Sequence, residues 1–341
     1  MDDTRTTPEL VAAALALAHA TAGTDDWGEH HAVLWRAAED GAAAAPLGIE
    51  LLGSDDPVAR AVGCDLLGDA CYHNESLRAD TAGRLVQLAG RETDAHVLCR
   101  LVGGLERTED PRGVAVLVAL AGHPDAELRE QVARSFALLL TGRPDGPDIR
   151  VLLTLSRDPE DEVRNWATFT LGFQAEVDSS EIRAALWERT TDPHPDTRVE
   201  GIQGLARRHD LRAVPLLAEL LDHPEGAPGH SLLAVQIMGV PELLPALAGY
   251  EFEGSSRAAA VAACDPARRA ELDAAAWALV SELHRLHPAL DAAVHMPRFD
   301  PGIELTVSGC DSAYDVGALL ARAGGDPRRA VELVASDAAG A

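Results

Sequence analysis

The clearest pattern in this chain lies in residues 158–172, which read DPEDEVRNWATFTLG. An Asp can accept hydrogen bonds from the free backbone N–H groups of a helix start, and Pro is tolerated in the first turn because it loses no intrahelical hydrogen bond there. Apolar residues then recur at helical spacings from Val163 through Ala167 to Leu171. The stretch therefore predicts a helix that begins near Asp158-Pro159 and buries one face.

This pattern recurs along the chain. Arg164 has counterparts at Arg129 and Arg198, 35 and 34 residues away, and an earlier counterpart at Arg60, whereas Leu98 takes the equivalent place in the copy between. Seven positions after each of these residues stands a large apolar side chain: Leu67, Leu105, Phe136, Leu171 and Leu205. Small residues one turn after the Arg, at Gly63, Ala167 and Gly201, allow neighbouring helices to approach closely.

A second helix is predicted after each of these first helices. The predicted starts lie near Ser76, Pro111, Pro147, Ser179 and Leu211. The segments 114–120 and 151–155 are so apolar that they must be buried on more than one side, as between stacked neighbours. A helix pair about every 34 residues is the signature of a helical solenoid.

The stretch at 158–172 resembles a HEAT-like repeat of the type also found in phycobilisome-lyase proteins. The resemblance covers residues 56–222 clearly and 223–249 weakly. It implies an all-α fold, a right-handed α-solenoid (superhelix) of HEAT-like helix pairs with atypical terminal caps. It implies little about activity, because such repeats serve many unrelated tasks.

We expect three regions. Residues 1–55 are predicted to form an N-terminal helical cap, with Trp27 and Trp35 covering the first repeat, and residues 56–249 hold the HEAT-like repeats. Residues 250–341 are expected to form a C-terminal helical cap or a small add-on domain. Within it, a long helix runs from Asp265 to about His287, and the alternating apolar residues of 302–308 predict a short strand or an extended loop.

Composition excludes several classes of function. The net charge is −26, which argues against non-specific binding to nucleic acid or to an anionic membrane surface and leaves a basic protein partner possible. The apolar run 11–18 is too short to span a membrane. Five scattered cysteines, with no CxxC pair, favour reduced thiols in a cytoplasmic protein.

The sequence carries no motif for catalysis or for a cofactor. It contains no Gly-x-Ser-x-Gly, no phosphate-binding loop and no dinucleotide fingerprint. His123, His194 and His223 each precede Pro at a junction between repeats, where turn or capping roles are expected. His284 and His287 share a helix face, but no carboxylate or Cys completes a metal site with them. We therefore predict no catalytic residue, no metal and no cofactor.

Two columns of arginine need an explanation, because Arg near a helix N-terminus opposes the helix dipole. For the first column, Arg60, Arg129, Arg164 and Arg198, we expect a ladder in which each Arg pairs with an Asp or Glu of the next repeat. Carboxylates available for this recur at Asp125, Asp161 and Asp196.

The second column marks the starts of the second helices: Arg78, Arg112, Arg150, Arg183 and Arg212. The windows of these helices hold nine Arg against six Asp or Glu. The resemblance to HEAT-like solenoids implies that they line the concave face. One interpretation is a neutral to mildly basic groove for a peptide or protein of acidic or mixed charge, with Trp187 as aromatic anchor; the other is that these Arg residues only pair locally.

The leading functional hypothesis is a non-enzymatic scaffold that binds a protein or peptide partner along its concave groove. One alternative is an enzyme on the same fold, either lyase-like or DNA glycosylase-like, for which Arg150, Arg183, Asp148 and Trp187 would be the candidate residues. Another is an acidic mimic of nucleic acid that blocks a basic protein. The net charge opposes the glycosylase, and the scattered acids do not form the ordered rows that a mimic requires.

Overall fold

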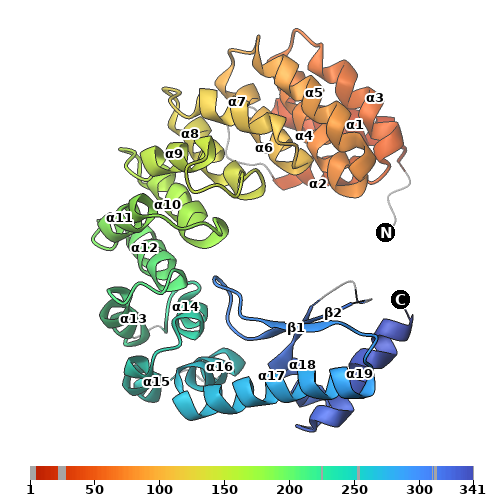
Figure 1. Cartoon of the computed structure of the whole chain (residues 1–341). Coiled ribbons are helices and arrows are strands. Elements are labelled where there is room, and N and C mark those ends of the chain that lie inside the picture. Colours follow the sequence, from red (N-terminus) through yellow and green to blue (C-terminus); the bar gives the residue numbers. More distant parts are fainter. Residues whose placement is uncertain are drawn as a thin grey trace. The chain divides into compact units, whose positions relative to one another are not determined.

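The computed structural model describes residues 5–21, 28–223, 226–251, 254–308, 310 and 313–340, so Trp27 lies outside the described residues. The chain divides into two compact units, Met1–Ala185 and Leu186–Ala341. Each unit is built mainly of helices packed in pairs, as Figure 1 shows, which makes the fold an all-α solenoid. The described helices include none with the length and apolar character needed to cross a membrane.

The first unit begins with three helices and continues with helix pairs. Its helices are α1 (Thr7–Ala20), α2 (Gly28–Ala38), α3 (Gly41–Leu52), α4 (Pro57–His73), α5 (Arg78–Ala89), α6 (Ala95–Thr108), α7 (Arg112–Leu120), α8 (Ala126–Ser135), α9 (Pro147–Leu155) and α10 (Asp161–Phe169). Helix α11 (Ser180–Arg189) contains the boundary between the units.

The second unit adds a small sheet to its helices. Its elements are α12 (Pro195–Arg207), α13 (Ala213–Leu221), α14 (Ser231–Met238), α15 (Leu244–Gly249), α16 (Ser255–Cys264), α17 (Pro266–Leu286), β1 (Ala292–His295), β2 (Glu304–Val307), β3 (Tyr314–Asp315), α18 (Val316–Arg322) and α19 (Pro327–Gly340).

Helix starts follow the capping rules, with one difference. The side chains of Asp56, Asp94 and Asp125 accept hydrogen bonds from backbone N–H groups two or three residues later, at 3.0–3.1 Å. Asp158, by contrast, accepts from Glu160 N at 3.0 Å, and α10 begins only at Asp161. Asp158 therefore stabilises the turn before the helix rather than capping the helix itself.

Two of the first helices in the first unit pack very closely. A Cβ on Gly68 of α4 would lie 2.9 Å from the Cα of Gly104 on α6, so these two helices nearly touch through their backbones. Figure 1 shows α4, α6 and α10 on one side of this unit and α5, α7 and α9 on the other. That the second helices line a concave groove stays a prediction.

The N-terminal helices cover the first repeat. Trp35 of α2 packs against Tyr72 and His73 at the end of α4, with ring centroids 5.1 and 4.8 Å apart. Leu10, Leu34 and Leu66, from α1, α2 and α4, share one buried core. This is the covering role expected for Trp35.

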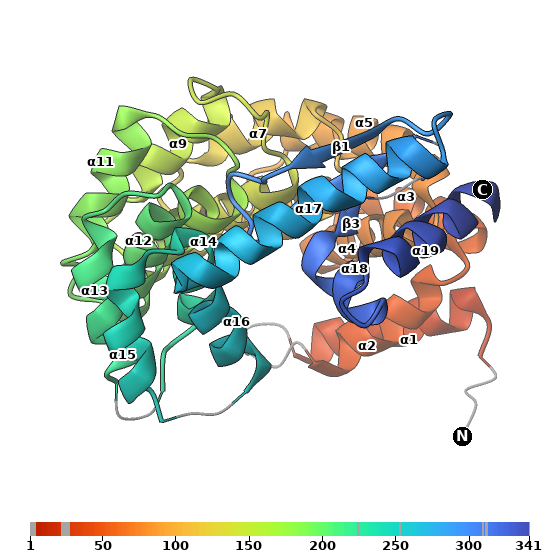
Figure 2. The ribbon, with the colours of Figure 1, turned by 60° about the horizontal axis from the view of Figure 1, so that its bottom comes forward.

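The end of the chain combines helices with a three-stranded antiparallel sheet in the order β1-β2-β3. The alternation predicted for 302–308 is confirmed, because Leu305 and Val307 of β2 are buried and the intervening Thr306 is exposed. In the register, Ala292 pairs with Val307 and Leu305 with Tyr314. The buried side of the sheet shares a core with α17, α18 and α19, which Figure 2 shows together.

Candidate binding surface

The first Arg column binds the turns between repeats. Each Arg donates from one terminal NH group to the carbonyls of the residues six and five positions earlier. Arg129 reaches His123 O at 2.9 Å and Pro124 O at 3.0 Å, and Arg164 makes the same pair of bonds at 3.0 Å. Arg60 and Arg198 repeat this geometry at 2.8–3.3 Å. These bonds explain why Arg recurs at a helix start that the dipole alone would disfavour.

Two of these guanidinium groups also pair with a carboxylate of the next repeat. Within the first unit, Arg60 binds Glu92 at 2.6 and 3.1 Å, and Arg129 binds Asp158 at 2.8 and 2.9 Å. Burial would raise the pKa of Asp158, but the hydrogen bonds from Arg129 and the backbone hold it below its ordinary value. We call this set of contacts the Arg ladder.

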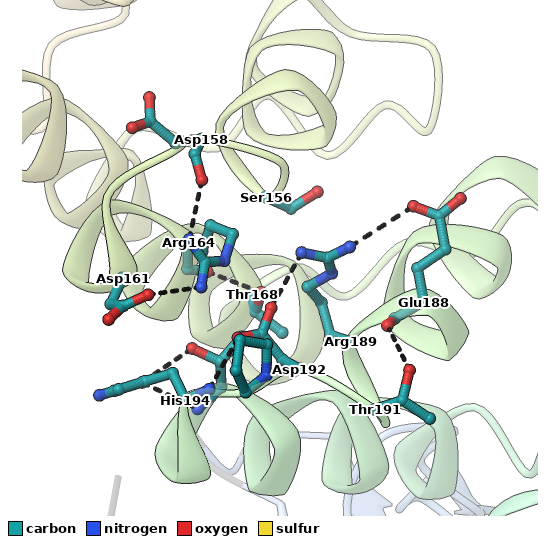
Figure 3. Close-up of polar contacts among 12 residues, drawn as sticks. Ser156, Asp158, Asp161, Arg164, Thr168, Glu188, Arg189, Thr191, Asp192 and His194 are labelled. Atoms are coloured by element: carbon teal, nitrogen blue, oxygen red, sulfur yellow. Dashed lines mark hydrogen bonds and ion pairs between the residues drawn. The ribbon is translucent and has the colours of Figure 1, made fainter.

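The acids of the Arg ladder differ from those expected. Asp125 caps α8, and Asp161 pairs at 2.6 Å with Arg164 of its own helix, as Figure 3 shows. The pairing acid instead lies six residues before the ladder position of its own repeat, which is Leu98 for Glu92 and Arg164 for Asp158. His194 is not at the position of the pairing acid. Its ring lies 3.0 Å from the Thr197 hydroxyl and caps the start of α12, which is the role expected of it.

In the second Arg column, four members pair locally with a carboxylate. The pairs are Arg78 with Glu109 at 2.9 Å, Arg112 with Asp110 at 2.6 Å, Arg183 with Asp178 at 2.7 Å and Arg212 with Asp210 at 2.7 Å. These contacts favour the local-pairing interpretation for those four residues.

Arg150 is different. Its terminal NH group donates to the Asp145 carbonyl, and no carboxylate in the described ranges forms an ion pair with it. Asp148 stands two residues earlier, at the spacing by which Asp110 pairs with Arg112. However, Asp148 is fully buried and accepts from Thr141 N and Oγ1 at 2.8 and 2.9 Å. Arg150 therefore presents an exposed cation that is not neutralised by its neighbour.

This cation lies at a shallow groove between α7 and α9. The groove has a volume of about 300 Å³ and is lined by Val118, Ala121, Gly122, Pro147, Arg150, Val151, Thr154 and Leu155. Most of these side chains are apolar, and Val118 is 37% exposed. The sequence reasoning identified Arg150 but missed the apolar lining, whose signal is the helical spacing of Pro147, Val151 and Thr154 on an exposed face. We call the exposed surface of α7 and α9 the second-helix face.

A second exposed feature lies in the second unit. Trp187 is 40% exposed, and the guanidinium of Arg212 lies 4.7 Å from its ring centroid, which is a cation–π contact. That guanidinium donates two hydrogen bonds to the Asp210 carboxylate, at 2.9 and 2.7 Å, and these bonds fix it in place. Leu211 beside it is 69% exposed. The structure thus brings together two of the predicted site residues, Trp187 and Arg212.

The described side chains offer little for nucleophilic or metal chemistry. Burial raises the pKa of the Cys99 thiol to about 12 and that of Cys264 to about 11, so both stay protonated near neutral pH. In the ranges that the structure covers, no three His, Cys, Asp or Glu side chains gather closely enough to hold a metal ion.

Comparison with known proteins agrees with the geometry. Residues 149–231 match the family model for HEAT repeats. This part of the chain is built of HEAT-like repeats. Protein YibA of Escherichia coli K12 is 34% identical over 90 residues, which are 26% of this chain and 32% of YibA, so the match spans about a third of that relative's length.

Two solved structures were compared with the fold, and one of them, that of YibA, shares it. The X-ray structure of Escherichia coli YibA has a TM-score of 0.54 at 21% identity, and the match covers 77% of this chain and 98% of YibA. The complex of CpcE and CpcF of phycocyanin lyase from Nostoc has a TM-score of 0.42 at 15% identity, covering 64% of this chain and 86% of that chain. The likeness to YibA is one of fold alone.

Proposed function

We propose that this protein is a non-enzymatic, cytoplasmic scaffold that binds a protein or peptide on its second-helix face. The observation that carries the proposal is Arg150, an exposed cation without a carboxylate partner at an apolar groove. A charge held beside apolar side chains suits a ligand that offers both a carboxylate and an apolar side chain. The other second-column Arg residues are already neutralised and would add little.

The partner that fits this surface is an acidic, extended segment with an apolar residue next to a carboxylate. Its carboxylate would pair with Arg150, and its apolar side chain would cover Val118 and Val151. Such binding relies on many modest contacts along repeats rather than on one deep pocket. In the second unit, Trp187 and Arg212 offer a rigid aromatic contact of the kind that dominates binding energy at interfaces.

The glycosylase-like alternative loses its candidate acid. An exposed carboxylate is needed beside the substrate, whereas Asp148 is fully buried and bound to Thr141. The scaffold hypothesis requires no such group.

The proposal is tested by site-specific photocrosslinking in native lysate with a photoreactive residue at Thr154, which lies in the groove. We expect a protein crosslinked through an acidic segment, and we expect Arg150→Glu to abolish the crosslink. The matched control is Arg112→Glu, which makes the same charge change at a paired Arg of the same column. If both variants or neither variant lose the crosslink, the groove is not the binding site.

A further inference from the structure

One surface of the second unit is occupied by the chain itself. The loop 296–303 joins β1 to β2, and Figure 1 shows the tip of this hairpin beside the end of α12. Its central residue, Phe299, is only 8% exposed although the neighbouring Met296 is 66% exposed. The loop therefore buries the side chain of Phe299 and leaves that of Met296 in solvent.

Arginine surrounds this aromatic ring. The guanidinium carbons of Arg207 and Arg208, at the end of α12, lie 5.8 and 5.6 Å from the Phe299 ring centroid, and that of Arg298 lies 5.5 Å from it. Arg207 also donates from Nε to the Phe299 carbonyl at 3.0 Å. Cations over an aromatic face attract its quadrupole, and the attraction strengthens where water is excluded.

The residues next to Phe299 in the loop also contact the end of α12. The Nε2 atom of His209 lies 3.2 Å from the Arg298 carbonyl oxygen, and the Arg207 guanidinium lies 4.0 Å from the Asp300 carboxylate. The loop thus contributes three consecutive residues, 298–300, and α12 receives them with three consecutive residues, 207–209. A linear motif of this kind can be supplied equally by a separate peptide.

The repeat pattern does not require these arginines. Counted from the ladder position, the places of Arg207 and Arg208 are taken by Phe173 and Gln174 after Arg164 and by Arg107 and Thr108 after Leu98, so no other of these copies carries the pair. Arg207 and Arg208 are 4% and 1% exposed, and burying guanidinium groups is costly unless specific contacts compensate. The pair therefore marks a built site for the segment that it holds.

We propose that the end of α12 is a recognition site for a partner segment in which an aromatic residue precedes a carboxylate, and that loop 296–303 is its displaceable internal occupant. The carboxylate of Asp300 is 57% exposed and lies 4.0 Å from the Arg207 guanidinium, so the acid of this segment is held more loosely than its aromatic ring. Because β1 and β2 tether the loop, its effective concentration is high, and a separate peptide competes well only when the loop is weakened.

The test uses the full chain and a fluorescent peptide with the sequence of residues 296–301, Met-Pro-Arg-Phe-Asp-Pro. Anisotropy should show weak binding to the wild type and at least tenfold tighter binding to Phe299→Ala, in which the site is vacated. A peptide with Ala in place of its Phe should bind neither protein. Adding Arg207→Gln to Phe299→Ala should abolish binding, whereas adding Arg257→Gln, which removes hydrogen bonds to the Leu247 carbonyl elsewhere in this unit, should not.

The proposal is overturned if a folded Phe299→Ala binds the peptide no more tightly than the wild type, or binds the Ala peptide equally well. Should circular dichroism show this variant to be unfolded, hydrogen exchange on the wild type decides. Excess peptide must then speed exchange in amides 296–303, and unchanged protection means that the loop is a permanent structural contact. The site is separate from the α7–α9 groove, so the failure of either proposal leaves the other standing.

Discussion

Glu200 of α12 is a largely buried carboxyl group whose environment favours its neutral form. Burial, reinforced by the charge of Asp196, raises its pKa to about 7. The native state therefore keeps a proton that the unfolded chain releases above its ordinary pKa of 4.5. The free energy of unfolding must therefore fall as the pH rises from 4.5 to about 7, and it should level off above that. At ~1.4 kcal/mol per pKa unit, the total loss is up to about 3 kcal/mol.

Replacing Glu200 with Gln removes this cost. We expect Glu200→Gln to raise the free energy of unfolding at pH 8 while changing it little at pH 4.5, measured by urea unfolding at both values. Glu219→Gln, on an exposed position of α13, is the control and should shift stability by less than ~0.5 kcal/mol. An equal effect of Glu200→Gln at both pH values would show that the carboxyl group is not protonated in the native state.

For single residues, the sequence predicts that a side chain caps a helix or carries a charge better than it predicts which residue that side chain pairs with. The spacing of Asp148 and Arg150 equals that of Asp110 and Arg112, yet only the second pair forms. The difference depends on Thr141, whose N–H and hydroxyl turn Asp148 inward, and no periodicity in the sequence reveals that turn. The cation at the groove was therefore predictable as an Arg but not as an unpaired one.

At the scale of helices, one repeat lacks both the Arg and the acid of the Arg ladder. Where Leu98 replaces the ladder Arg, the next junction carries His123 instead of an acid, whereas Arg129 is matched by Asp158. We expect Arg129→Leu and Asp158→His each to destabilise the protein by roughly 2 kcal/mol, because each leaves a mostly buried charge unpaired. The double variant imitates the natural pair and should recover about 1–3 kcal/mol of that sum.

The measurement is a double-mutant cycle by urea denaturation. The exposed pair of Arg112 and Asp110 supplies a comparison cycle, whose coupling should stay below about 1 kcal/mol. Additive effects of Arg129→Leu and Asp158→His would contradict the ladder as a stabilising contact between repeats.

The close approach of α4 and α6 gives a second prediction for the elements. Gly68→Ala places a methyl group 2.9 Å from the Cα of Gly104, and backbone cannot yield as a flexible side chain can. We expect a loss of about 1–3 kcal/mol, seen as a lower Tm. Gly83→Ala in α5 is the matched control, because its Cβ meets only the end of Arg112 at 3.4 Å and Ala favours a helix over Gly by up to ~1 kcal/mol. If both variants gain stability, these helices are less tightly packed than described.

The helices themselves were largely predictable, because apolar periodicity and Asp or Pro starts recur every 34 residues. The sheet was only partly so. Alternation identified β2, but β1 reads Ala-Ala-Val-His and β3 has two residues, which is too little for a pattern. That the second helices line a concave groove stays a prediction, because the curvature of an array depends on how closely neighbouring helices approach, which is a tertiary property.

For the whole molecule, the repeat pattern predicted the array but not its division at Ala185–Leu186. A repeat specifies contacts with its neighbours, whereas the boundary of a compact unit depends on packing summed over many elements. The predicted limits at residues 55 and 249 stay predictions.

Net charge is the property of the whole molecule with the most direct consequence for stability. With a net charge of −26, the acidic side chains of the folded chain repel one another. The Arg ladder offsets this repulsion only locally, because its ion pairs are close contacts between mostly buried groups. Monovalent salt shortens the screening length from about 30 Å at 0.01 M to about 8 Å at 0.15 M, which weakens distant repulsion more than it weakens buried pairs. We therefore expect Tm to rise between these two salt concentrations in calorimetry.

A fall in Tm would mean that attraction between exposed pairs, such as Arg112 with Asp110, outweighs the self-repulsion. Sodium chloride and potassium chloride must give the same shift, because screening depends on ionic strength and not on which monovalent cation is present.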